Sequence, residues 1–109
     1  MTVTLDEENV QQMAYLVSQE QRSWDEYTWM LAQEELRLGA ACAMPKEDFR
    51  HGGLPKMVKI FPAKIQPSLN EEEVRKLAFE IAQRSPSLQD LHWFIAQRRC
   101  ISDFILKQA

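Results

Sequence analysis

The stretch Leu5–Cys42, LDEENVQQMAYLVSQEQRSWDEYTWMLAQEELRLGAAC, contains no proline and no glycine before Gly39. Apolar side chains recur within it at an unbroken spacing of seven residues. Seven residues are close to two helical turns, so these side chains form one stripe along a helix. We call this set the heptad stripe; it consists of Val10, Val17, Trp24, Leu31 and Leu38.

The length of this stretch leaves two arrangements open. One continuous helix would be about 57 Å long at about 1.5 Å per residue, whereas a compact domain of this size is about 35 Å across. The helix therefore either breaks or overhangs its domain, where a second chain covers it. The capping pattern Ser23–Glu26 favours a break, and the absence of a strong breaker in residues 18–23 favours continuity. The prediction is a long amino-terminal helix, either straight or kinked.

An extended crossing is predicted after this helical region. Met44–Pro45 disfavours further helix, because the residue before proline avoids helical backbone angles. Lys56–Phe61 is rich in β-branched and apolar residues and is followed by Pro62, which is typical of a short strand. Three pairings stay open for it: the segment Thr2–Leu5, the same segment of a second copy, or no strand at all.

Two helices are predicted at the carboxyl end. Asn70 and the acids after it form a helix start, followed by apolar residues at helical spacing up to residue 82. Ser85–Ser87 reads as a turn, and a last helix runs from about Leu88 to Lys107. The predicted fold is mostly α, with the amino-terminal helix, a proline-punctuated crossing with at most one short strand, and a carboxy-terminal αα-hairpin. Residues 1–109 are expected to form a single small helical domain.

Composition excludes several classes of protein. The chain is 45% hydrophobic and 27% charged, which is ordinary for a globular domain. It has no run of eighteen apolar residues and no basic or apolar leader, so we expect no membrane partner, no secretory signal and a cytoplasmic location. Cys42 and Cys100 lie in apolar contexts without ligand spacing, and we expect both to be reduced thiols.

Charge is unevenly distributed along the chain. Residues 1–50 hold ten acids and four bases, a balance of −6, and residues 51–109 hold six acids and nine bases, a balance of +3. The two halves are therefore electrostatically complementary, within one chain or across a dimer. The acidic half also permits a third hypothesis, an acidic inhibitor whose amino-terminal face competes with nucleic acid for a basic partner.

Catalytic and cofactor-binding patterns are not recognisable in the sequence. It has no nucleophile elbow, paired-cysteine motif or phosphate-binding loop. The only histidines are His51, expected in a loop, and His92, expected to be structural. The carboxylate pair Glu34–Glu35 lacks the histidine of a di-metal motif, so we expect a solvated surface there. The sequence predicts no enzyme, no cofactor and no metal site.

The leading hypothesis is a non-enzymatic adaptor or regulatory factor that binds another protein and acts as a homodimer. Helical spacing brings Trp24, Tyr27, Leu31 and Leu38 to one face, and Trp93 belongs to a second apolar stripe. Aromatic residues are enriched where proteins bury each other's surfaces. These five residues are the predicted protein interface, with burial in the protein's own core as the alternative.

Residues 74–99 resemble a helix-turn-helix unit and suggest DNA binding as an alternative function. In this hypothesis Gln89 reads bases, and Arg84, Arg98 and Arg99 contact phosphates. The resemblance is partial, because the turn contains Pro86 rather than glycine and Asp90 would face the phosphates.

Overall fold

The computed structural model describes residues 1–50 and 52–108, so the expectation for His51 lies outside the described residues. Most described residues are helical, which confirms the predicted fold class. None of the described helices is long and apolar enough to cross a membrane. In chain order the elements are β1 (Thr2–Thr4), α1 (Glu7–Gln19), α2 (Trp24–Leu38), α3 (Lys46–Phe49), β2 (Met57–Lys59), the short 3₁₀ helix η1 (Pro62–Lys64), α4 (Glu71–Gln83) and α5 (Leu88–Gln108).

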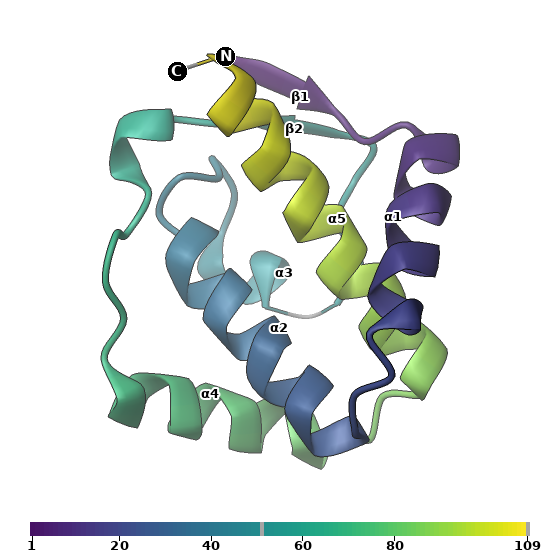
Figure 1. Cartoon of the computed structure of the whole chain (residues 1–109). Coiled ribbons are helices and arrows are strands. Elements are labelled where there is room, and N and C mark those ends of the chain that lie inside the picture. The colour runs from purple at the N-terminus through teal and green to yellow at the C-terminus, as the bar shows by residue number, and fades with distance from the viewer. Residues whose placement is uncertain (51, 109) are drawn as a thin grey trace.

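The long helix α5 is central to the packing. It lies against both α1 and α2, and α4 packs on α2 (Figure 1). The β1–β2 ladder closes the end of the molecule at which α5 finishes (Figure 1). The radius of gyration is 12.9 Å and the longest axis is 33 Å, so a continuous helix over residues 5–42 would not fit inside this volume.

The amino-terminal helical region is broken between α1 and α2. Gln21 adopts a φ of 52°, the left-handed region in which helices commonly end. Ser23 then caps α2, because its Oγ accepts from the Glu26 amide and the Glu26 carboxylate accepts from the Ser23 amide, both at 3.1 Å. Of the two predicted arrangements, the break is therefore the one found.

The break lets the chain cover its own heptad stripe. Val10, Val17, Leu31 and Leu38 are each at most 2% exposed, and Trp24 is half-buried. Because α2 folds back, α5 supplies apolar partners to the stripe on both sides of the break. The stripe therefore does not overhang the molecule, which removes the reason for expecting a second chain.

The predicted strand pairs with the amino terminus. β1 and β2 are antiparallel, with Val3 opposite Val58. Both valines are buried, whereas the residues on either side of each are exposed. The alternation places one face of this small ladder on the core. Of the three pairings that the sequence left open, the first is found.

Two consecutive helices form at the carboxyl end, as predicted. Asn70 caps α4 by accepting from the Glu72 amide at 2.8 Å. Ser87 and Asp90 cap the start of α5 reciprocally, through bonds of 3.0 and 3.3 Å. The chief packing of α4 is with α2, whereas α5 packs on both α1 and α2. The two helices therefore do not pack on each other as the predicted αα-hairpin would.

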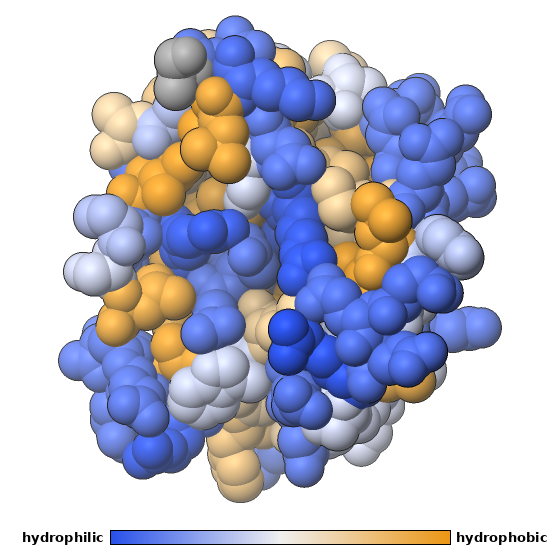
Figure 2. Space-filling model, viewed as in Figure 1, coloured by the Kyte–Doolittle hydropathy of each residue, from blue (hydrophilic) through white to orange (hydrophobic). Residues whose placement is uncertain are grey.

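The surface in the view of Figure 2 is mostly hydrophilic, interrupted by separate hydrophobic patches. One of these patches lies between α1 and α5 (Figures 1 and 2). Exposed apolar side chains on α1 include Tyr15 and Leu16.

Candidate functional site

The five residues of the predicted interface serve mainly to hold the chain together. Tyr27, Leu31 and Leu38 are buried in the protein's own core, at 0–2% exposure, so they offer no surface to a partner. Trp24 and Trp93 are half-buried. The indole of Trp24 donates to the carbonyl of Pro86 at 2.8 Å and ties the start of α2 to the turn before α5. For Tyr27, Leu31 and Leu38, the structure therefore favours the alternative of a core surface.

The predicted phosphate contacts have other partners. Arg98 is completely buried, so the expectation that it meets a phosphate is wrong for this structure. Arg84 donates to the Arg50 carbonyl. Gln89 is exposed at the start of α5. Arg99 is paired with Glu20, as described next.

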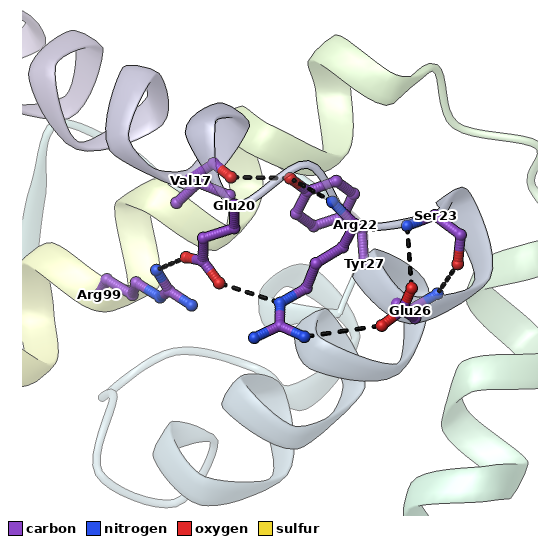
Figure 3. A network of polar contacts seen from close by, with 7 residues as sticks. All are labelled: Val17, Glu20, Arg22, Ser23, Glu26, Tyr27 and Arg99. Atoms are coloured by element: carbon purple, nitrogen blue, oxygen red, sulfur yellow. Dashed lines mark hydrogen bonds and ion pairs between the residues drawn. The ribbon is translucent and has the colours of Figure 1, made fainter.

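The Arg99–Glu20 pair belongs to a polar network at the break between α1 and α2 (Figure 3). Glu20 also accepts from Arg22 at 3.0 Å, and Arg22 approaches Glu26 at 3.5 Å. The hydrogen bond from Arg99, aided by Arg22, lowers the pKa of Glu20 against the opposing effect of burial. This network joins α5 to the α1–α2 junction and leaves Arg99 partly neutralised.

Arg98 links α3 and the turn after it to α5. Its Nη2 donates to the carbonyls of Phe49 at 2.7 Å and Gly52 at 2.8 Å, and its Nη1 donates to the Phe94 carbonyl at 2.9 Å. The guanidinium also lies over the Phe49 ring, 5.0 Å from its centroid. Gly52 has a φ of 114°, and a Cβ at this position would meet the Phe94 ring at 3.0 Å. This turn therefore requires glycine.

The carboxylate of Glu35 lies beside this guanidinium. Its side chain is 1% exposed, and Oε1 is 3.3 Å from Nη2 of Arg98. A guanidinium Nη carries two hydrogens, and both hydrogens of Nη2 are directed at the Phe49 and Gly52 carbonyls. The Glu35 carboxylate therefore lies close to the positive charge of Arg98 but accepts no hydrogen bond from it. Among the described residues, neither oxygen of Glu35 has a hydrogen-bond partner.

The electrostatics of Glu35 follow from this geometry. Burial raises its pKa to about 7, although the positive charges of Arg98, Arg50 and Arg84 act in the opposite direction. Burial also lowers the pKa of Arg98, but a guanidinium stays protonated in proteins. Near neutral pH the site thus holds a fixed cation beside a carboxyl group that exchanges a proton.

Two neighbouring cavities meet at Glu35. The larger, of about 520 Å³, lies between α2, α3 and α4 and is here called the α2–α4 cavity. The smaller, of about 190 Å³, is bounded by α2, α4, the α4–α5 turn and α5. Glu35 and Arg50 line both of them. Ionisable side chains of both signs line the larger cavity: Glu35, Glu73 and Glu80 with Lys46, Arg50 and Lys76.

The sequence interpretation missed Glu35. The pair Glu34–Glu35 was expected at a solvated surface, and this is wrong for Glu35, which is buried. A usable signal was present, because Glu35 lies four residues after Leu31 and three before Leu38, on the face of the heptad stripe. Glu34 points to a different side and pairs with Arg37.

No family model, curated protein or solved structure matches the chain. Within the described residues, no cluster of three or more His, Cys, Asp or Glu side chains has an arrangement that would hold a metal ion. The proposals below therefore rest on the geometry of this chain alone.

Proposed function

We propose that the protein is a non-enzymatic binding factor that contacts another protein through the seam between α1 and α5, here called the α1–α5 groove. The observation that carries the proposal is the 58% exposure of Leu16 on α1; Tyr15, at 63%, lies next to it on the same helix but outside the groove. Leu16 lines a groove of about 350 Å³, together with Met13 and Phe104. Contiguous exposed apolar surface is typical of a protein-contacting site, whereas isolated apolar residues are common on any surface.

The charge around the groove favours a basic partner. α1 carries Glu7 and Glu8 in its first turn and has no basic residue. Asp6 and Asp103 border the groove, with Lys107 as its one base. A partner segment with apolar side chains flanked by lysine or arginine would complement this surface. The hypothesis of an acidic inhibitor predicts the same kind of basic partner.

The other hypotheses are weaker after the fold is known. The homodimer was expected because the heptad stripe is longer than one domain. The chain itself covers that stripe, so this reason no longer applies. The hypothesis of DNA binding is weaker because Arg98 is buried and Arg99 is paired with Glu20, so neither arginine is free to contact a phosphate. A cytoplasmic location stays part of the proposal, supported by the free thiols Cys42 and Cys100.

The test uses two synthetic amphipathic helical peptides, one of leucine and lysine and one of leucine and glutamate, with fluorescence anisotropy as the readout. The leucine–lysine peptide should bind and the leucine–glutamate peptide should not. Leu16→Gln should weaken binding about tenfold, since a well-packed anchor side chain is worth on the order of 1–2 kcal/mol. Phe79→Gln is the matched control, because Phe79 is 65% exposed on α4, away from the groove.

Equal binding of both peptides, or equal loss in the two variants, would contradict the proposal. Light scattering after gel filtration detects a competing occupant of the groove. A dimer that Leu16→Gln dissociates would assign the groove to a second copy of this chain, in place of a different protein.

A further inference from the structure

The hydrogen-bonding deficit at Glu35 requires an explanation. Buried carboxylates normally accept several hydrogen bonds, and an unsatisfied one is costly. Here both hydrogens of the nearest donor, Arg98 Nη2, are directed at backbone carbonyls. Among the described residues, no N–H donor is directed at the carboxylate, and Glu35 lines a cavity that a small molecule could enter from solvent.

The α2–α4 cavity has the size and chemistry of a ligand site. Its volume of about 520 Å³ lies within the range of small-molecule pockets. Leu36, Met44 and Leu77 supply apolar contact surface, and Met44 has a flexible side chain that adapts to a ligand. Arg50 is half-buried and borders the same cavity as Glu35.

The arrangement of charge selects the class of ligand. A simple amine would be attracted to the three acids of the cavity, Glu35, Glu73 and Glu80, but repelled by its three bases, Arg50, Lys46 and Lys76. A simple anion would be attracted to the three bases but repelled by the three acids. A molecule that carries an ammonium group and a carboxylate a few ångströms apart complements both sets of side chains.

We propose that the α2–α4 cavity binds a small zwitterion of the α-amino-acid class, with its ammonium group against Glu35 and its carboxylate against Arg50. Both carboxylate oxygens of Glu35 are fully buried, so the ammonium group reaches them only when the side chains over them move. The site is built from α2, α3 and α4, whereas the α1–α5 groove is built from other elements, so this proposal does not depend on the proposed function.

The first experiment is a thermal-unfolding screen at pH 7.5 with each of the twenty protein amino acids at 10 mM. At about ten times its Kd, a ligand should raise the Tm by about 5–10 °C. Each amino acid that shifts the Tm is then compared with its N-acetyl form, which lacks the ammonium group, and with its decarboxylated amine. Both analogues should lose the shift.

Calorimetry with variants then locates the site. Arg50→Gln should weaken binding at least tenfold, and Lys76→Gln should weaken it less. Arg75→Gln is the matched control, because Arg75 neighbours Lys76 on α4 but pairs with Glu71 and Glu72 at the surface. Glu35→Gln should also reduce binding. If this substitution in the core prevents folding, the Arg50 and Lys76 variants are sufficient to test the proposal.

Three results would overturn the proposal. One is the absence of a Tm shift with every amino acid. Another is an undiminished shift with the N-acetyl form or with the amine, which would assign the cavity to an anion or a cation alone. The third is an equal loss of binding in Arg50→Gln and Arg75→Gln. None of these results bears on peptide binding at the α1–α5 groove.

Discussion

Nη2 of Arg98 lies 3.3 Å from Oε1 of Glu35 and bridges α5 to α2 in the protein interior. The same nitrogen donates to the carbonyls of Phe49 and Gly52. One guanidinium thereby neutralises a buried charge and satisfies backbone groups of the turn after α3. Removal of one member of a buried pair leaves the other uncompensated, which is why such pairs are sensitive to single substitutions.

The first prediction compares two adjacent arginines. Arg98→Ala should lower the free energy of unfolding by about 3–5 kcal/mol, since it leaves the Glu35 carboxylate and buried carbonyls without a partner. Arg99→Ala should cost about 1 kcal/mol or less, because its pair with Glu20 is partly exposed. Urea unfolding at pH 7.5 measures both. Equal costs in the two variants would contradict the structural role assigned to Arg98.

The second prediction concerns the pH dependence of stability. The pKa of Glu35 is raised from 4.5 to about 7 in the folded protein, so between these values the folded state binds a proton that the unfolded state has lost. The contribution of this group to stability is therefore fully present below about pH 4.5 and is lost as the pH rises through about 7. The loss is on the order of 3 kcal/mol.

Glu35→Gln should abolish this part of the pH dependence. The measurement is the difference in unfolding free energy between variant and wild type at pH 4.5, 6 and 8. Taking a difference is necessary because burial lowers the pKa of His92, and that group contributes stability that is lost as the pH falls below about 6.5. Glu34→Gln, at the neighbouring position, is the matched control; the same flattening in that variant would refute the assignment to Glu35.

The third prediction concerns the break between α1 and α2. Gln21→Gly should stabilise the protein by about 0.5–1 kcal/mol, because Gln21 has a φ of 52°, which glycine adopts without steric cost. Gln11→Gly should destabilise it by about 1 kcal/mol, since Gln11 is exposed within α1. Thermal unfolding separates the two effects by sign. A loss of stability in Gln21→Gly would show that the left-handed conformation is not the one adopted in solution.

The fourth prediction concerns the tie between α2 and the α4–α5 turn. Trp24→Phe should cost about 1 kcal/mol more than Trp29→Phe, since both remove part of a half-buried indole but only Trp24 donates to Pro86. The mass in solution should be the same for wild type and Trp24→Phe, because the contact lies within one chain. If the wild-type protein is a dimer and this variant is a monomer, Trp24 belongs to a protein interface, as the sequence predicted.

The sequence alone was sufficient to predict the mostly helical fold and the last two helices. The Asn70 cap forms as predicted, and the Ser23–Glu26 capping box forms as one of the two open arrangements required. These features depend on side chains within three or four residues of each other, so a local pattern contains the necessary information. The buried apolar residues of the heptad stripe were predictable for the same reason.

Only the tertiary structure decided whether the first helical region breaks. The left-handed turn at Gln21 lacks the glycine that usually marks such a position. It forms beside Tyr27, whose hydroxyl donates to the Val17 carbonyl at 2.7 Å and accepts from the Arg22 amide at 3.3 Å. The return of α2 also buries the stripe against α5, and that gain depends on a helix that comes much later in the chain.

The candidate site was likewise decided by tertiary structure. Helical periodicity could have placed Glu35 on the inward face, but a carboxylate there is tolerable only if a cation comes close to it. That cation is Arg98, on a different helix, and its position depends in turn on the carbonyls of Phe49, Gly52 and Phe94. The charge at Glu35 is thus stabilised by contacts between distant segments, and no local pattern of residues contains them.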